Sequence, residues 1–576
     1  MASSAAMPIG LDDAGPATLS APRGAALVEE LLAAQQDLSA VERFAQFHDT
    51  DGGAAHAKHY RSLLPSTPPG PGQQYAFEVD LDRCSGCKAC VTACHTLNGL
   101  DEHETWRDVG LLIGGSRSLP VLQHVTAACH HCLEPACLKA CPVNAYEKDP
   151  ATGIVVHLDD QCFGCRYCTL ACPYDVPKYH REKGIVRKCD MCSSRLAAGE
   201  APACVQACPH QAIAIKLVDV QQVVEDAEAT LFLPGAPDPQ ITLPTTIYKT
   251  RRVFPRNLLA ADHFNSQPQH PHWPLVLMLV LTQLSVGAFA AGLVLELWAR
   301  AEMAAAVRPL NAVTALVFGL LALAASIFHL GRPQYAFRAV LGLRHSWLSR
   351  EIVAFGAFAG LACVYAAVAL APVETFGSLN ELSASLAWAV VVVGGAAISC
   401  SVMIYALPQR DLWTPARTGI RFLLTAVCLG IATLWLSALV LAVTRPSSAT
   451  VGFAEQAGRL LCLALLVAAT AKLLWEASLL RHLLVRNMTS MRRSALLVKG
   501  ELANVALARF ALGALGGIVM PAFLLSHFSA ENVAWQPARL LIFASVLFVA
   551  CLAGEVLERY LFFAAVAGPR MPGGLR

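Results

Sequence analysis

The sequence predicts two parts of different fold class, a soluble α+β domain followed by an all-α membrane bundle of eight helices. Of its 576 residues 55% are hydrophobic and only 15% are charged. The mean hydropathy of +0.48 is too high for an ordinary soluble protein and too low for a chain that is apolar throughout. Sixteen of the 21 cysteines lie between Cys84 and Cys208, and long apolar segments begin only at Trp273.

The charge balance excludes some classes of protein. The chain has 44 Lys and Arg residues against 42 Asp and Glu residues, for a net charge of +2. This balance gives no support to binding of nucleic acid. The high apolar content excludes a disordered chain, apart from termini and linkers.

The soluble part divides by composition into three segments. Residues 1–72 are expected to be a tail and a helical extension, with an amphipathic helix or helix pair over 25–48 that holds Ser39 and Glu42 at capping-box spacing in its middle. The first 23 residues contain neither a twin arginine nor an apolar signal segment, which favours a cytoplasmic soluble domain. Residues 73–220 are the cysteine-rich domain, and the proline-rich residues 221–272 are a predicted linker. Within the domain, strands are expected at 75–79, 153–157 and 212–218.

The cysteines form four consecutive groups of four. The groups are Cys84, Cys87, Cys90 and Cys94; Cys129, Cys132, Cys137 and Cys141; Cys162, Cys165, Cys168 and Cys172; and Cys189, Cys192, Cys204 and Cys208. The first and third groups have the C-x2-C-x2-C-x3-C spacing with which bacterial ferredoxins hold a [4Fe–4S] cube. Sixteen ligands at four per cube predict four clusters in a tandem ferredoxin-like iron–sulfur domain. The iron of these clusters would be bound by the same sixteen cysteines.

Two other uses of cysteine compete with this interpretation. Proline follows the second, third and fourth groups, as Pro142, Pro173 and Pro209. Structural zinc is satisfied by C-x2-C pairs and requires neither a third cysteine two residues later nor such a proline. Disulfides are disfavoured in a cytoplasmic domain.

A row of clusters carries single electrons between distant redox centres. The five other cysteines lie in apolar segments and are expected to be packing residues: Cys363, Cys400, Cys428, Cys462 and Cys551.

The membrane part is predicted from eight apolar segments of about 20 residues or more, each long enough to cross a bilayer as a helix. They lie near 273–298, 309–330, 351–372, 385–407, 422–443, 460–480, 505–526 and 540–562.

Loops after the even segments hold twelve basic residues: Arg332, Arg338, Arg344, Arg350, Arg410, Arg417, Arg421, Arg481, Arg486, Arg492, Arg493 and Lys499. Loops after the odd segments hold five: Arg300, Arg308, Arg445, Arg459 and Arg539. The positive-inside rule then predicts that the soluble domain and the C-terminus lie in the cytoplasm.

Histidines and acidic residues indicate a redox site in the membrane. His329 is the only histidine inside a predicted span, whereas a bis-histidine haem needs two, so no haem is expected. A quinone pool is then the simplest redox partner. The second span ends at His329 and the third begins at Glu351, so both are expected at the membrane face that carries the cluster domain, where they could accept protons from a quinol.

Structural roles for these residues stay open on chemistry alone. His329 could cap the second span, and Glu351 could neutralise Arg350 at a helix N-terminus. Lys472, Glu476 and Glu555 are further ionisable residues inside predicted spans. Lys472 and Glu476 are expected to form an intramembrane salt bridge, because they lie four residues apart on one helix.

Particular stretches of the sequence resemble a known family. CSGCKACVTACH, CHHCLEPACLKACP, CFGCRYCTLACPYDVPKY and RKCDMC…CVQACP resemble the four-cluster iron–sulfur subunits of the dimethyl sulfoxide reductase family of molybdoenzymes. Residues 272–289 and 329–351 resemble the eight-helix anchor subunit of the same reductases. The family usually keeps these subunits as separate chains, whereas here they are fused.

The resemblance implies how the cysteines are shared and where quinol binds. It implies four sets: Cys84, Cys87 and Cys90 with Cys208; Cys189, Cys192 and Cys204 with Cys94; Cys129, Cys132 and Cys137 with Cys172; and Cys162, Cys165 and Cys168 with Cys141. The intact third group implies four [4Fe–4S] clusters with no [3Fe–4S] centre. The family's quinol site falls on His329 and Glu351.

The predicted function is that of an electron-transfer and membrane-anchor subunit of a molybdopterin oxidoreductase in the inner membrane. Menaquinol or ubiquinol would supply electrons to the clusters, which would pass them to a separate molybdenum-containing catalytic subunit. One alternative is the reverse flow, from a formate-type dehydrogenase to quinone. A second alternative is a redox-sensing or transport protein of the membrane. Against it, the predicted spans lack the Gly- and Pro-interrupted segments that mark the binding sites of transporters.

Overall fold

The computed structural model describes residues 28, 32–33, 57–371, 379–529 and 537–574. The chain forms two compact units, Met1–Arg61 and Ser62–Arg576. Most of the helix expected over 25–48, including its capping box at Ser39 and Glu42, lies outside the described residues. The second unit contains both the cysteine-rich part and the apolar helices.

A three-stranded sheet joins the two ends of the cysteine-rich domain. Strand β1 (Gln73–Asp80) pairs antiparallel with β8 (Ile213–Asp219) and parallel with β9 (Ile247–Lys249). Because buried and less buried side chains alternate along most of β1, one face of this sheet packs into the core. The runs expected at 75–79 and 212–218 fall on β1 and β8.

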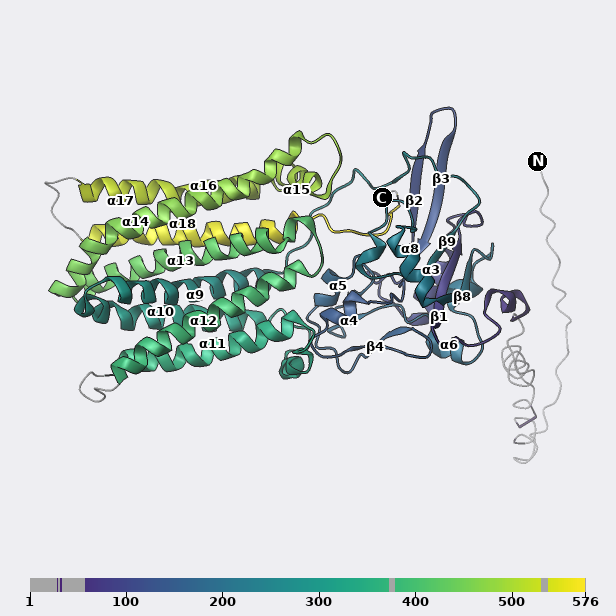
Figure 1. The fold of residues 1–576 in the computed structure, drawn as a ribbon, viewed down its shortest axis with the longest axis horizontal. Helices are drawn as coiled ribbons and strands as arrows, with labels where there is room; N and C mark the ends of the chain where they lie inside the picture. Colours follow the sequence, from purple (N-terminus) through teal and green to yellow (C-terminus); the bar gives the residue numbers. More distant parts are fainter. Residues whose placement is uncertain (1–27, 29–31, 34–56, 372–378, 530–536, 575–576) are drawn as a thin grey trace, which may run out of the picture. The chain divides into compact units, whose positions relative to one another are not determined.

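A second sheet and two short ribbons complete the strands of this domain (Figure 1). Strands β2 (Asp108–Gly115) and β3 (Pro120–Ala127) form a hairpin, to which β10 (Leu259–Ala260) adds an edge. The ribbons pair β4 (Tyr146–Lys148) with β5 (Val155–His157), and β6 (Lys178–His180) with β7 (Ile185–Arg187). Short helices follow or lie between the cysteines: α3 (Ala89–Asn98), α4 (Ala136–Ala140), α5 (Tyr167–Ala171), α6 (Ser193–Ala197) and α7 (Ala203–Gln206). The small α+β domain predicted from the sequence is confirmed.

Residues 221–272 contain more structure than a simple linker. Helix α8 (Val220–Glu228) is capped by Asp219, whose carboxylate accepts from the backbone amides of Gln221 and Gln222. Further along, the same segment supplies β9 to one sheet and β10 to the other. Strands this short are fixed by the neighbouring strand rather than by their own hydrophobic pattern, so the sequence did not reveal them.

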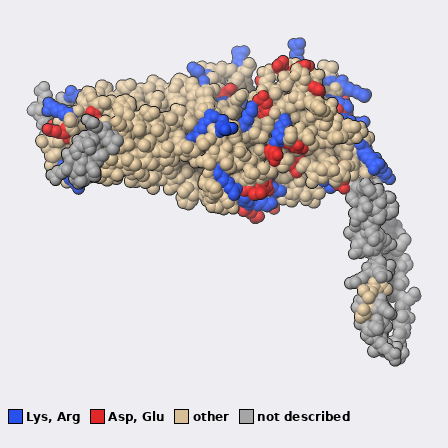
Figure 2. Space-filling model, turned by 60° about the horizontal axis from the view of Figure 1, so that its bottom comes forward, with Lys and Arg blue, Asp and Glu red and all other residues tan. Residues whose placement is uncertain are grey.

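The described residues contain eight helical segments long and apolar enough to cross a membrane, which confirms the predicted bundle. They are α9 (Trp273–Trp298), α10 (Ala301–Ile327), α11 (Trp347–Leu370), α12 (Leu379–Ala406), α13 (Pro415–Thr444), α14 (Ser448–Ala477), the continuous α16–α17 (Ala503–Ala514 and Met520–Ser529) and α18 (Pro537–Ala564). A π-helical turn, Leu515–Val519, joins α16 to α17. Figure 2 shows charged side chains gathered on the soluble part and along its junction with the largely uncharged flank of the bundle.

Helices α9 and α13 form the centre of the bundle and touch through glycine. A Cβ atom on Gly287 of α9 would lie 1.9 Å from the carbonyl oxygen of Ala426 on α13. Likewise, a Cβ atom on Gly430 of α13 would lie 2.3 Å from the backbone of Gly287. Only glycine permits this approach, as in other tightly packed membrane helices.

The C-terminal segment after α18 returns to the soluble domain and packs beside β2 (Figure 1). The amide of Leu111 donates to the carbonyl of Gly573 at 3.2 Å. Arg570 forms an ion pair with Asp262 at 2.6 Å. The two halves of this unit are therefore connected at both ends of the bundle sequence, by residues 221–272 before it and by this segment after it.

Candidate cluster sites and membrane cavity

The loops of the first and third cysteine groups have the same backbone conformation. Gly86 and Gly164, the residues before the second cysteine of each group, both have φ near +74°. Lys88 and Arg166, the residues after it, both have φ near +60° and precede a short helix. A Cβ atom on Gly86 would lie 2.5 Å from the ring of His124, so the loop requires glycine there.

The cysteines surround separate cavities rather than converging on one point. Three cavities are each lined by four cysteines: Cys129, Cys132, Cys137 and Cys172; Cys94, Cys189, Cys192 and Cys204; and Cys141, Cys162, Cys165 and Cys168. In each case three cysteines come from one group and the fourth comes from another. Among the described residues, no three Cys, His, Asp or Glu side chains gather as ligands of a single metal ion would.

The other four cysteines are also close neighbours. Burial, and then the thiols of Cys90, Cys208 and Cys87, raise the pKa of Cys84. These four thiols therefore lie within electrostatic reach of one another. Cys87 is exposed, so this set lies at the surface of the domain.

The cavities fit iron–sulfur cubes, which bind one thiolate at each iron. Backbone amides point at the sulfurs: that of Ala145 lies 3.2 Å from Sγ of Cys141, and that of Ala212 lies 3.2 Å from Sγ of Cys208. Burial raises the pKa of the Cys141 and Cys172 thiols to about 11. These groups are thus neutral thiols at pH 7 unless a metal replaces their protons.

The four sets of cysteines follow one another in space, with one buried polar side chain at each junction. Tyr146 lies beside Cys141, Cys168 and Cys137, and so between two of the cavities. Arg107 lies among Cys90, Cys94, Cys189 and Cys204, between the surface set and its neighbour. Lys188 lies at the junction between the two middle sets, beside Cys129, Cys137 and Cys189.

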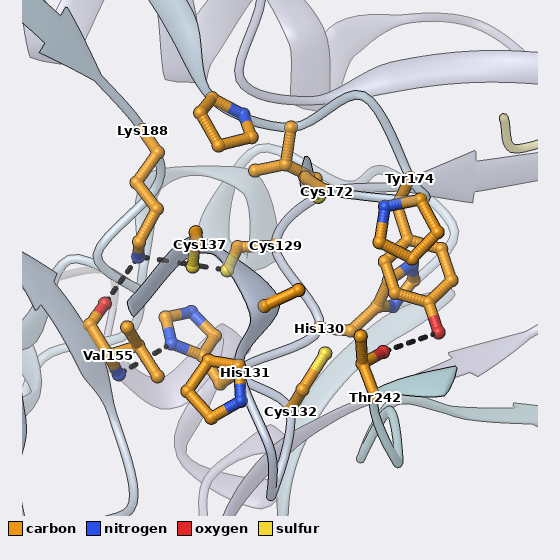
Figure 3. A pocket seen from close by; sticks show the side chains of 15 residues that line it. Cys129, His130, His131, Cys132, Cys137, Val155, Cys172, Tyr174, Lys188 and Thr242 are labelled. Atoms are coloured by element: carbon orange, nitrogen blue, oxygen red, sulfur yellow. Dashed lines mark hydrogen bonds between the residues drawn. The ribbon is translucent and has the colours of Figure 1, made fainter. Parts of the chain in front are cut away.

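Lys188 is fully enclosed and was not identified from the sequence. Its ammonium donates to the carbonyl of Cys189. It also donates to the carbonyl of Val155 and lies 3.7 Å from Sγ of Cys129 (Figure 3). Burial alone would lower the pKa of Lys188, but the thiols around it outweigh burial and raise the pKa above its usual value. Its position directly before Cys189 is the only sequence signal that could have revealed it.

The third cysteine loop lies directly against the bundle. The amide of Arg332 donates to the carbonyl of Phe163 at 2.9 Å, and Gly331 packs against the backbone of Gly164 and Gly184. Ser346 donates to the carbonyl of Ala140 at 2.8 Å. The segment between α10 and α11 is therefore the surface on which the cysteine domain rests.

A cavity of about 470 Å³ lies between this loop and the membrane helices. Its lining is mostly apolar, with a few polar side chains from both parts. The lining includes Cys165, Tyr167, His272, His329, Glu351 and Tyr405. Cys165 also lines a cysteine cavity, so the two spaces are separated by a single loop.

His329 lies at this cavity but not inside a span as expected. Helix α10 ends at Ile327, and His329 follows it in the loop that contacts the cysteine domain. Its Nε2 lies 3.1 Å from the carbonyl oxygen of Cys165, and its Nδ1 lies 3.3 Å from Nδ1 of His272. Burial, followed by His272 and Arg166, lowers the pKa of His329 to about 4.

Glu351 lies at the same cavity, in the second turn of α11. Its side chain is buried and accepts a hydrogen bond from the hydroxyl of Ser401 on α12. Arg350, which could have neutralised it, instead donates to the carbonyls of Leu343 and Arg344. The structure thus brings together the two residues singled out for the quinol site.

The other ionisable residues in the spans form a separate buried network. Lys472 lies 4.0 Å from Glu476, the partner expected from the sequence. It lies closer to Glu555, at 2.5 Å. Arg509 joins both carboxylates, at 2.8 Å from Glu476 and 3.0 Å from Glu555. The sequence interpretation missed Arg509 because its partners lie on other helices.

The fold and the cavities define a multi-pass membrane protein that carries an iron–sulfur domain. Residues 121–218 match the family model of a 4Fe–4S dicluster domain, and residues 267–565 match that of the DMSO reductase anchor subunit. The chain belongs to the dimethyl sulfoxide reductase anchor family, fused to an iron–sulfur part like that of such reductases.

Similar proteins match part of the chain. An anaerobic dimethyl sulfoxide reductase subunit of Haemophilus influenzae is 35% identical over 189 residues, which are 31% of this chain and 91% of that protein. The subunit of the same name from Escherichia coli K12 is 36% identical over 185 residues, 31% of this chain and 88% of that protein. The hydrogenase-2 operon protein HybA of Escherichia coli O157:H7 is 36% identical over 172 residues, 25% of this chain and 52% of that protein.

The charge of Lys188 yields a testable prediction. Replacing it by methionine removes a buried positive charge next to Cys129 and Cys137, so the reduced state of the adjoining cluster loses stabilisation. We expect its midpoint potential to fall by roughly 100 mV, the size of a unit-charge interaction at an effective dielectric constant of about 20. Redox titration followed by electron paramagnetic resonance measures this shift. Lys139→Met is the matched control, because Lys139 is exposed and paired with Glu134, and an equal shift there would contradict the prediction.

Proposed function

We propose that this chain oxidises membrane quinol and conducts the electrons through four [4Fe–4S] clusters to a separate molybdenum-containing catalytic subunit. In this role it is the electron-transfer and anchor part of an oxidoreductase and holds no catalytic molybdenum itself. The observation that carries the proposal is the single loop around Cys165, which separates the membrane cavity from a cavity lined by four cysteines.

The arrangement of the cysteines supports four clusters. Each of the three cavities holds the four cysteines that the family resemblance groups together, and the remaining four are neighbours at the surface. When bound, the clusters would supply one-electron carriers between the membrane cavity and the exposed end of the row. The exposed set at Cys87 is then the place where the catalytic subunit would dock.

The membrane cavity supports quinol as the donor. Its volume and apolar lining suit a quinone ring, and its polar groups are few and placed at the soluble side of the bundle. Quinol oxidation releases two electrons and two protons, so the site needs proton acceptors as well as a nearby electron acceptor. His329 and Glu351 are the residues proposed to bind the quinol hydroxyls here.

Orientation in the membrane follows from the basic residues. Arg332 and Arg338 lie in the segment between α10 and α11, and their side chains donate to the carbonyls of Lys183 and Asp160 in the cysteine domain. Arg350, in the first turn of α11, donates to the carbonyl of Leu343 in that segment. The positive-inside rule places such a surface in the cytoplasm. We therefore propose an inner-membrane protein whose iron–sulfur domain faces the cytoplasm.

The number of clusters is tested by iron and sulfide analysis after anaerobic purification. Four cubes predict about 16 irons per chain. Cys129→Ser and Cys172→Ser, each removing one ligand of the same proposed cluster, should lower the iron content by the same amount. About 8 irons per chain, or zinc in place of iron, would overturn the assignment.

The quinol site is tested by His329→Ala and Glu351→Gln in the assembled complex. Because general acid–base groups contribute about a hundredfold or more to rate, we expect reduction of the clusters by a quinol analogue to slow at least that much. A soluble dye that reduces the clusters directly should keep its rate. Parental quinol rates in both variants would contradict the proposed site, and a parallel loss of clusters would indicate a purely structural role.

Orientation is tested with reporter fusions at Leu379, the first residue of α12, and at Lys499, at the end of α15 (Ser490–Lys499). Alkaline phosphatase is active only outside the cytoplasm, so we expect activity at Leu379 and none at Lys499. The reverse pattern would place the iron–sulfur domain outside the cytoplasm.

A further inference from the structure

We propose that His131 donates a hydrogen bond to the iron–sulfur cluster in the cavity of Cys129, Cys132, Cys137 and Cys172, and thereby raises the reduction potential of that cluster. The inference rests on the proposed four clusters and adds a residue that sets the potential of one of them. It is carried by a ring nitrogen of His131, which is enclosed in the wall of this cavity and lacks a partner among the described residues.

A hydrogen bond to the His131 ring fixes where the ring carries its hydrogen. The backbone amide of Val155 donates to Nδ1 of His131 at 3.0 Å (Figure 3). Because a backbone amide can only donate, Nδ1 carries no hydrogen and is the acceptor of the ring. The hydrogen of the ring is therefore on Nε2. A ring with hydrogens on both nitrogens could not accept from Val155, so His131 is neutral in this structure.

The donor at Nε2 has no acceptor within the described part of the protein. His131 is fully buried, and its Nε2 forms no hydrogen bond with the described residues. Buried donors in native proteins are nearly always paired, because an unpaired one has lost its hydrogen bond to water. The ring lines the cavity, so the group that fills this space is the acceptor at hand. A [4Fe–4S] cube supplies sulfurs that accept hydrogen bonds.

The contacts of the neighbouring His130 leave its hydrogen position open. Its Nε2 is also unpaired within the described residues, and its ring lines the same cavity. However, its Nδ1 lies 2.8 Å from the hydroxyl of Thr246, which can either donate or accept. The hydrogen of His130 can therefore lie on either nitrogen, whereas that of His131 cannot.

The backbone holds the His131 ring at the cavity. The carbonyl of His131 accepts from Nε2 of Gln74, on β1, at 2.9 Å. The φ of His131 is +42°, in the left-handed region that histidine and asparagine adopt more readily than most residues. Because the loop is tied to β1 and the ring is tied to Val155, the ring cannot turn away from the cavity without breaking these contacts.

A donor at this position favours the reduced form of the cluster. Reduction adds one electron, and an N–H group stabilises the added negative charge more than it stabilises the oxidised form. No proton is transferred in this step, since the hydrogen stays on Nε2 of His131. Hydrogen bonds to the sulfurs are among the features that set the potential of a cluster.

Two substitutions separate this role from a structural one. His131→Gln can place an amide N–H at the distance of Nε2, but it loses the acceptor for the amide of Val155. His131→Asn can place a carbonyl oxygen at the distance of Nδ1 and keeps that acceptor, but it loses the donor. A residue that only holds Val155 would be replaced best by asparagine, whereas a donor to the cluster would be replaced best by glutamine.

The experiment is a redox titration of both variants in the full complex, followed by electron paramagnetic resonance. We expect His131→Asn to lower the equilibrium constant for reduction of one cluster about tenfold, the effect of losing one hydrogen bond to a charged group. A tenfold change is about 59 mV for a one-electron couple. His131→Gln should stay near the parental potential. An unchanged potential in His131→Asn, or an equal fall in both variants, would overturn the proposal.

His180→Asn is the matched control. Nδ1 of His180 also accepts from a backbone amide, that of Lys183 at 3.3 Å, but its Nε2 lies 3.3 Å from the carboxylate of Asp101. His180 is not among the residues that line the three cysteine cavities. We expect all potentials of this variant to be parental, and a fall equal to that of His131→Asn would refute the assignment.

A second measurement does not depend on the potential. In protein that contains nitrogen-15 histidine, pulsed electron paramagnetic resonance of the reduced cluster should detect the nitrogen that donates to it. Both variants at position 131 should lose one such coupling, because neither asparagine nor glutamine carries the label. Retention of every coupling in both variants would count against His131 as the donor.

Iron analysis of the same samples separates this inference from the proposed function. If the parental protein holds about 16 irons per chain and the potentials do not move, only the inference fails. If the parental protein holds about 8, the proposed four clusters fail as well. Loss of iron from both variants would assign His131 to the folding of the site and would also overturn its role as a donor.

Discussion

Each cysteine-lined cavity is closed by a residue from a second loop, as when Cys172 completes the set of Cys129, Cys132 and Cys137. Neither loop can therefore form its site alone, and the loops must fold against each other. The segments between them need only reach from one cavity to the next, which four-residue helices and three-residue strands achieve. The pairing of β1 with β8 brings the first and last cysteine groups together in the same way. This shared closure, rather than a large apolar core, determines the fold of the soluble part.

Taking charge out of water imposes a second requirement on the same region. Thiolates buried in a low-dielectric interior need nearby donors or cations. Backbone amides supply some of them, and Arg107 and Lys188 supply full charges at two of the three junctions between sets. Because each cation lies between two sets, it acts on both at once. The junction beside the membrane has the neutral Tyr146 instead, so the row of sites is not electrostatically uniform.

Local patterns predicted what is local, and contacts between distant segments escaped them. Hydropathy located eight spans, and cysteine spacing located four groups, because both signals lie within single segments. The β2–β3 hairpin was missed, since no strong alternation marks its strands and β10, its edge partner, is two residues long. The contact of His272 with His329 joins residues 57 apart in sequence. Arg509 likewise carries no local signal, because its two carboxylate partners come from α14 and α18.

The buried ion network explains how the membrane cavity keeps its shape. Apolar side chains gain little by packing together in lipid, so apolar contacts alone fix helix positions weakly there. Lys472, Arg509 and Glu555 tie α14, α16 and α18 with directed contacts that lose their partners if a helix slides. Arg559, one turn beyond Glu555, lies 3.9 Å from the ring centre of Phe422, and Phe422 packs on Tyr405, which lines the cavity. The last four spans thus provide a fixed wall behind a cavity whose polar groups come from the first four and from the cysteine domain.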